Sequence, residues 1–141
     1  MKETFIIGID FGQQRIGVAV SDSRKKIAFP LDVIHRENKS YGLNKLKRLL
    51  DDKDIDSFVV GVPYRENGEL GAEGLEVLEY IKSLKEYFQV SVITWDERYT
   101  SMIAESAMLS DDVSRKGRRA VIDKIAAQII LQSYLDSLHS S

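Results

Sequence analysis

The sequence predicts an α/β fold built on a mixed five-stranded sheet, and three observations lead to this prediction. Short apolar runs of strand length alternate with segments in which leucine and isoleucine recur at helical spacing. The first three runs follow one another through short turns, whereas a helical segment precedes each of the last two. A helix between two strands implies parallel neighbours, so the expected strand order is 3-2-1-4-5, with strand two antiparallel and helices on both faces.

Each element follows from its own pattern. The expected strands are 4–9, 15–22, 27–34, 57–62 and 90–95. Pro30 interrupts the third strand, which places that strand at an edge of the sheet. Leucines at 43, 46, 49 and 50 predict a first helix, and Leu75, Leu78, Ile81 and Leu84 mark a second one ending near Phe88. Two further helices are expected at about 100–109 and 117–138, separated by the charged loop SDDVSRKGRR.

Composition excludes several classes of protein. A chain of 141 residues with 43% hydrophobic and 30% charged residues is typical of one soluble domain, 1–141. The absence of cysteine excludes disulfides and thiolate metal sites. Neither a signal peptide nor a membrane-spanning segment is visible, so we expect a cytoplasmic protein with no membrane partner. The net charge of -2 means that binding to nucleic acid would need a local basic patch.

Two of the parallel strands end in acidic residues, where α/β sheets form their sites. Functional groups in such sheets gather outside the carboxyl ends of parallel strands. Asp10 comes at the end of the first strand, and Asp96 and Glu97 follow the fifth. Taken singly, these acids have ordinary alternatives: Asp10 as a turn former beside Gly12, and Asp96 as a cap of the next helix.

A third acid, Asp123, lies at the border of an apolar helical stripe. Ala120, Ala126 and Ala127 are its neighbours three or four residues away, and they leave room for this turn to approach the sheet closely. A carboxylate buried there would need a cation or hydrogen-bond donors. The alternative is an exposed pairing with Arg119, which would contribute only a few tenths of a kcal/mol.

Four segments together resemble the YqgF family over nearly the whole chain. They are GIDFGQQRIGVAVSD, VVGVPYRENGELGAEG, WDERYTS and RRAVIDKIAAQIILQSYLD. The resemblance implies an RNase H-like fold, related to RuvC-type Holliday-junction resolvases, and a nuclease acting at the 5′ end of pre-16S ribosomal RNA. The family's acidic positions correspond to Asp10, Glu97 and Asp123. The chain departs from the family pattern at Gln13 and Gln14, where a small hydroxyl residue and a lysine are usual.

These residue types suit metal-dependent hydrolysis of a phosphodiester. Two hard cations about 3.5–4 Å apart can activate water and stabilise the leaving oxygen, and carboxylates can bridge them. We therefore expect Asp10, Glu97 and Asp123 to be both catalytic residues and ligands of Mg²⁺ or Mn²⁺, with Asp10 as the bridge.

Substrate contacts are expected from a local basic cluster. The candidates are Arg98, Arg115, Lys116, Arg118 and Arg119. The ordinary alternative for the run at 114–119 is a solvated start of a helix, and Arg98 could equally support the neighbouring acid. The expected partner is nucleic acid, either a ribosomal RNA precursor or branched DNA, bound by a monomer or a homodimer.

Three other functions stay open on sequence grounds. One is a resolvase-like DNA endonuclease with the same site. Another is a non-catalytic nucleic-acid-binding module, against which the three acids count. The last is a phosphotransferase of the actin-like ATPase superfamily, which shares the D-x-G hairpin but normally needs two such domains.

Overall fold

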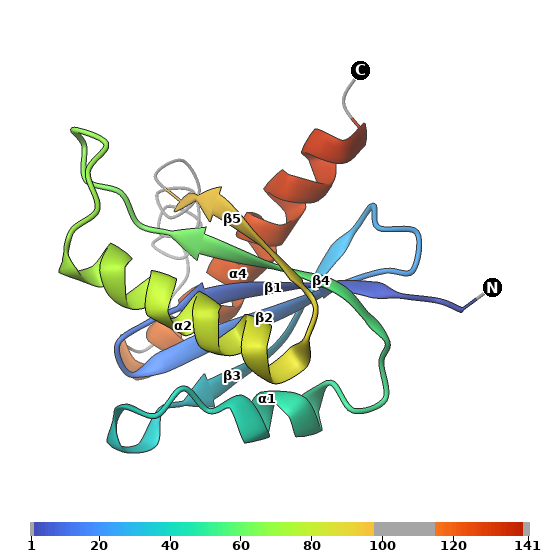
Figure 1. Ribbon diagram of the computed structural model, residues 1–141, viewed down its shortest axis with the longest axis horizontal. Coiled ribbons are helices and arrows are strands. Elements are labelled where there is room, and N and C mark those ends of the chain that lie inside the picture. Colours follow the sequence, from blue (N-terminus) through green and yellow to red (C-terminus); the bar gives the residue numbers. More distant parts are fainter. Residues whose placement is uncertain (1, 98–114, 140–141) are drawn as a thin grey trace.

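Five strands form one sheet in the order β3-β2-β1-β4-β5, as the sequence predicts (Figure 1). The computed structural model describes residues 2–97 and 115–139, and the side chains of residues 2–97 and 125–139. The predicted helix at 100–109 lies outside the described residues. The elements are β1 (Phe5–Phe11), β2 (Arg15–Ser21), β3 (Ala28–His35), a 3-10 turn η1 (Glu37–Lys39), α1 (Leu43–Leu49), β4 (Ile55–Val62), α2 (Ala72–Phe88), β5 (Ser91–Asp96) and α4 (Arg115–His139).

The strand directions confirm the mixed sheet. Strand β1 pairs antiparallel with β2, which pairs antiparallel with β3. Strand β4 lies parallel to β1 on one side and to β5 on the other. The carboxyl ends of β1, β4 and β5 therefore meet at the same edge of the sheet.

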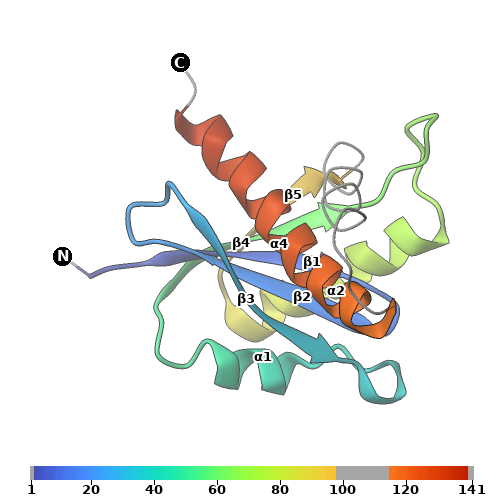
Figure 2. The same ribbon diagram turned by 180° about the vertical axis from the view of Figure 1, so that it is seen from behind.

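Helices cover both faces of the sheet, with a different core on each (Figures 1 and 2). On one face, α1 and α2 pack over a cluster of large side chains that includes Phe58, Tyr80 and Leu84. On the other face, α4 crosses β1, β2, β3 and β4 over a smaller cluster that includes Ala19, Ala127 and Leu131.

The approach of α4 to the sheet depends on a glycine in β1. A Cβ atom at Gly8 would lie 2.7 Å from the Cβ of Leu131 and 2.9 Å from the carbonyl oxygen of Ala127. No larger residue fits there without moving the helix. The close approach expected from the alanines of this helix is thus confirmed, one turn after residue 123.

The buried face of α2 differs from the predicted one. Leu75 and Leu78 are 56% and 39% exposed, so this part of the expected stripe faces outward. The residues that face the core are Gly74, Val77, Tyr80, Ile81 and Leu84. Their spacing of three and four residues follows the 3.6-residue turn, whereas a repeat of strictly three residues drifts around the helix.

Two glutamines of α4 cover the start of the edge strand β3. The side-chain amide of Gln132 accepts a hydrogen bond from the backbone N–H of Ala28 at 2.8 Å and donates one to the carbonyl of Lys26 at 2.9 Å. Gln128 donates to the carbonyl of Ala28 at 3.1 Å. Pro30, in the same strand, lies at the edge as its sequence predicts.

No helix among the described residues has the length and apolar character needed to cross a membrane.

Candidate active site

Asp10 lies in β1, one residue before the strand ends, and pairs with Gly17 of β2. Side chains alternate along a strand, so Asp10 shares a face with Ile6 and Gly8, the face covered by α4. The N–H of Gly12 donates to the carbonyl of Arg15 at 2.9 Å and closes the turn into β2. The half-buried carboxylate therefore stands at the carboxyl edge of the sheet, as predicted.

Glu97 follows β5 directly, and its carboxylate lies against the neighbouring strand. A Cβ atom at Gly61 of β4 would be 2.5 Å from Oε2 of Glu97 and 2.6 Å from Cδ1 of Ile130. The glycine thus leaves the space that the carboxylate occupies. The parallel pairing of β4 with β5, which sets Gly61 opposite Trp95, brings Glu97 to the same edge as Asp10.

A third carboxylate, Glu73, joins this edge and was not predicted. Helix α2 begins at Ala72, and Glu73 lies in its first turn, where a negative charge is favoured by the helix dipole. The rule of strand ends could have identified it, because α2 is the helix that follows β4. It was missed because the apolar pattern used to predict this helix begins at Leu75, which places residue 73 in the preceding loop.

The three acids border one pocket of about 260 Å³. The β1–β2 turn, the segment after β4 and the start of α2 form its walls. The lining residues are Asp10, Phe11, Gly12, Gln13, Pro63, Glu73, Val77 and Glu97. The pocket thus joins segments far apart in the sequence at the edge where the parallel strands end.

Burial and like charges change the ionisation of Glu97. Loss of solvent and, to a smaller extent, the nearby carboxylates of Asp96 and Glu73 together raise the pKa of this carboxyl to about 7. A cation in the pocket would oppose both effects by favouring the charged form. Near neutral pH a cation bound in the pocket would therefore compete with a proton for the Glu97 carboxylate.

The donor set fits a hard divalent cation. Asp10, Glu73 and Glu97 offer carboxylate oxygens, which are the ligands that Mg²⁺ and Mn²⁺ prefer. Within residues 2–97 and 125–139, however, no three Asp, Glu or His side chains are grouped closely enough to make a complete metal centre. A complete centre therefore needs a ligand from outside these ranges or an inward movement of the three acids.

The third predicted ligand, Asp123, lies on α4, but its side chain is outside the described ones. Residue 123 is one helical turn before Ala127, whose carbonyl oxygen approaches Gly8 of β1. Figure 2 shows the first turns of α4 beside the β1–β2 hairpin. The backbone thus carries Asp123 toward the edge that holds Asp10, while its role as a ligand stays a prediction.

The basic residues are only partly described. Arg98 lies outside the described residues, and no side chain from Arg115 to Arg119 is described. Their backbone corrects the prediction of a loop, because α4 begins at Arg115 and includes Lys116, Arg118 and Arg119. Arginine and lysine are good helix formers, and one glycine at 117 costs only about 1 kcal/mol.

The strand order and the site at the sheet edge define the class of protein. An RNase H-like fold is shown by two structural neighbours. Thermus thermophilus RuvC in complex with a Holliday junction substrate superposes with a TM-score of 0.56 at 13% identity, covering 96% of both chains. The fowlpox virus resolvase with its Holliday junction DNA gives 0.53 at 12% identity, covering 97% of this chain and 100% of that one.

Sequence comparison gives the family within this class. Residues 4–137 match the family described as "RuvX: Holliday junction resolvase". A Clostridium botulinum protein named "Putative pre-16S rRNA nuclease" is 41% identical over 133 residues, covering 94% of this chain and 97% of its own. A Bacillus licheniformis protein of the same name is 44% identical over 137 residues, covering 96% and 99%. The chain belongs to the RuvX (YqgF) family, which confirms the resemblance seen in its motifs.

Proposed function

We propose that the protein is a nuclease that hydrolyses phosphodiester bonds with the help of Mg²⁺ or Mn²⁺, and that it processes the 5′ end of pre-16S ribosomal RNA in the cytoplasm. The observation that carries this proposal is the pocket lined by Asp10, Glu73 and Glu97 at the edge of the sheet where the parallel strands end. The names of the family's relatives supply the substrate. The chain acts as one nuclease domain.

The chemistry assigns a role to each acid. Asp10 is the central ligand because it stands on the middle strand of the sheet, between β2 and β4. Glu97 and Asp123 would each hold a cation, and Glu73 lies near Glu97. The bound cation supplies an activated water and offsets charge on the phosphate. Asp10 and Glu97 orient it, and Gly61 leaves room for the Glu97 carboxylate.

Substrate is held by the basic residues Arg98, Arg115, Lys116, Arg118 and Arg119. Their sequence positions flank the acids, with one directly after Glu97 and four before Asp123 on α4. These side chains would contact the phosphates of an RNA strand. Phosphate contacts carry no sequence information, so binding would depend little on the RNA sequence.

The family description favours a second substrate, the Holliday junction. The same chemistry would cut branched DNA, and two symmetric cuts would favour a homodimer over a monomer. The two substrates are alternatives for one site, so a single assay can compare them.

The test is cleavage of two labelled substrates: RNA spanning the 5′ end of pre-16S rRNA, and a four-way DNA junction. We expect cleavage of the RNA with Mg²⁺ or Mn²⁺ and none with a chelator. Glu97→Gln should abolish it, whereas Glu69→Gln, an exposed acid of the loop before α2, should not. Cleavage of the junction alone would select the resolvase, and cleavage of neither would reject the nuclease.

A further inference from the structure

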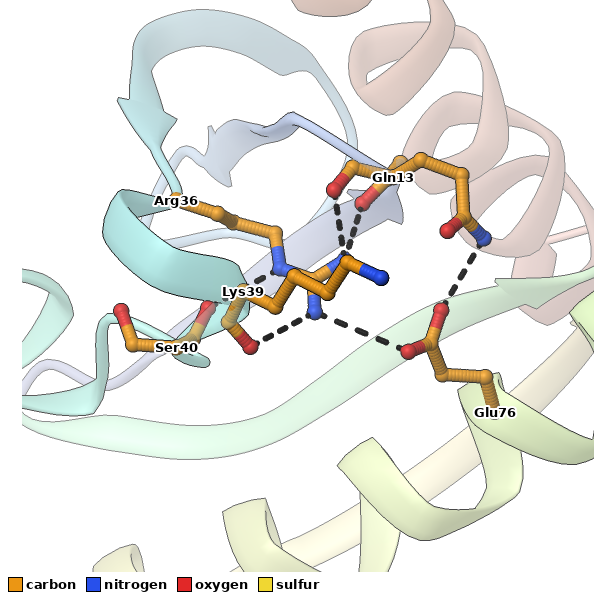
Figure 3. A network of polar contacts seen from close by, with 6 residues as sticks. Gln13, Arg36, Lys39, Ser40 and Glu76 are labelled. Carbon is orange, nitrogen blue, oxygen red and sulfur yellow. Dashed lines mark hydrogen bonds and ion pairs between the residues drawn. The ribbon is translucent and has the colours of Figure 1, made fainter.

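Arg36 contacts every carbonyl of the turn that follows Asp10. Its Nη1 donates to the carbonyls of Gly12 and Gln13, both at 2.9 Å. Its backbone N–H donates to the carbonyl of Gln14 at 2.8 Å. The three successive carbonyls of the β1–β2 turn therefore all accept hydrogen bonds from one residue, which follows β3 directly in the sequence. Figure 3 shows the contacts made by its guanidinium group.

The rest of the guanidinium is equally occupied. Nε donates to the carbonyl of Ser40 at 2.9 Å, and Nη2 donates to that of Lys39 at 3.0 Å. The rings of Phe11 and Tyr41 lie over the group, with their centroids 4.5 and 5.7 Å from Cζ. Only 1% of the side chain is exposed. A buried charge satisfied in this way fixes the geometry of the groups around it.

A link from the same group reaches α2. Nη2 of Arg36 lies 3.7 Å from Oε2 of Glu76, and the amide nitrogen of Gln13 donates to Oε1 of the same carboxylate at 3.0 Å. Glu76 is three residues after Glu73, so it lies on the next turn of the same helix. Turn and helix, which form two walls of the acidic pocket, are thus joined through one carboxylate (Figure 3).

We propose that Arg36 is a positioning residue of the active site, which holds the β1–β2 turn against α2 and so fixes the places of Asp10 and Glu73 on the border of the pocket where a divalent cation would bind. This inference rests on the proposed function. Arg36 is buried behind the turn and does not line the pocket, so it acts through the backbone of residues 12–14. Groups that orient metal ligands from behind typically change metal affinity or activity 10–100-fold when replaced.

The first test is Arg36→Lys, which keeps the charge but replaces the planar five-donor fork by three donors on one atom. We expect Mn²⁺ affinity, measured by calorimetry, to fall at least about 10-fold. In the cleavage assay kcat should fall similarly while KM for the RNA stays unchanged, because Arg36 does not reach the pocket. Wild-type affinity and kcat in the folded variant would overturn the proposal.

Glu76→Ala provides a variant that should fold readily, because its side chain is 32% exposed. It leaves the bonds from Arg36 to the turn intact and removes only the link to α2. We expect a smaller loss of Mn²⁺ affinity, roughly 3–10-fold, as for one or two lost hydrogen bonds. Unchanged affinity in this variant would overturn the role given to the link.

Two controls separate positioning from general stability. Leu84→Ala creates a cavity near the far end of α2, and it should lower stability without changing Mn²⁺ affinity. Tyr80→Phe removes a buried hydroxyl that has no hydrogen-bond partner among the described residues, although its ring packs on Phe11 and Tyr41. Neither control should change the affinity, and a loss in either equal to that of Arg36→Lys would overturn the proposal.

Amide hydrogen exchange tests the role of Arg36 without relying on metal binding or cleavage. The N–H of Gly12, bonded to Arg15, should exchange at least about 10-fold faster in Arg36→Lys and at the wild-type rate in Tyr80→Phe. If the wild-type protein neither binds Mn²⁺ nor cleaves, the proposed function fails, and exchange still decides the positioning. An equally protected Gly12 in Arg36→Lys would overturn it.

Discussion

The charged groups on the two sides of the β1–β2 turn have opposite environments: the cation on one side is fully paired, and the anions on the other side repel one another. Behind the turn, Arg36 is buried, and its donors meet four backbone carbonyls and a carboxylate. In front of it, the pocket collects carboxylates, and the pKa of Glu97 is raised to about 7. One side is arranged for stability, while the other accumulates like charges, which is typical of a functional site.

The largest effect should come from removing the central acid of the pocket. Asp10→Asn should reduce metal-dependent cleavage by more than the 10–100-fold expected for groups behind a metal ligand. Its melting temperature without metal should equal or exceed that of the wild type, because one of several repelling charges is gone. Arg36→Lys should instead lower both activity and stability, so the pair of variants separates the two sides of the turn.

The comparison fails if Asp10→Asn cleaves normally, since Asp10 would then not be the central ligand. It also fails if Asp10→Asn is strongly destabilised while Arg36→Lys is not. Calorimetric unfolding with a chelator present measures the stability of both variants under one condition.

The raised pKa of Glu97 predicts how stability varies with pH. The folded protein holds this proton up to about pH 7, whereas the unfolded chain releases it near the ordinary value of 4.5. The stabilising effect of protonation is therefore complete below about pH 4.5 and is lost as the pH rises to about 7. At 1.36 kcal/mol per pKa unit, a shift from 4.5 to about 7 corresponds to a loss of roughly 3 kcal/mol.

Urea unfolding at pH 5 and pH 8, in the presence of a chelator, measures this loss. Glu97→Gln should reduce the difference between the two pH values by most of that amount. Adding Mn²⁺ at pH 8 should restore stability to the wild type, because the cation binds only the folded state. An identical pH dependence in wild type and variant would contradict the assignment to Glu97.

Two glycines on the same face of the sheet sharpen the comparison further. Gly61→Ala would place a Cβ 2.5 Å from the Glu97 carboxylate and 2.6 Å from Ile130, and Gly8→Ala would place one 2.7 Å from Leu131. Both substitutions should cost about 1–3 kcal/mol through overpacking. Only Gly61→Ala should also weaken Mn²⁺ binding, and equal weakening by Gly8→Ala would show that packing of α4 is responsible.

The smallest effect concerns the basic residues of α4. Replacing Arg115, Lys116 and Arg118 by alanine should weaken RNA binding and make the slope of log affinity against log salt shallower by roughly 1–2 units. Arg119 is retained because it is a candidate partner of Asp123. A control with Lys47, Arg48 and Lys82, exposed on α1 and α2, removes the same charge elsewhere. Equal salt slopes in the two variants would show that the RNA does not bind at the basic residues of α4.

The strand order and two of the pocket acids could be predicted from sequence because they depend on local patterns. Apolar runs fix the strands, and the direction of each crossover fixes their neighbours. Asp10 and Glu97 follow from the rule for strand ends. Both residues lie at the carboxyl edge of the sheet because β1 and β5 form where their apolar patterns predict.

Glu73 and Arg36 could not be found in this way, for different physical reasons. Glu73 depended on where α2 begins, and helix starts are poorly marked when Gly71, at the N-cap, makes no side-chain capping bond. Arg36 resembles an exposed cation after an edge strand. Its burial arises from carbonyls at residues 12–14 and 39–40, which only the folded chain brings together.

The amide side chains of Gln128 and Gln132 have a consequence for association between copies of the protein. An exposed edge strand offers unpaired backbone groups to any other chain, and it is a common starting point for aggregation. Here each amide acts as a short piece of peptide, taking the N–H and carbonyl of Ala28 that another strand would need. Pro30, two residues further on, has no N–H to offer. The protein's own helix thus occupies the backbone groups with which a neighbouring strand would begin to pair at this end of β3.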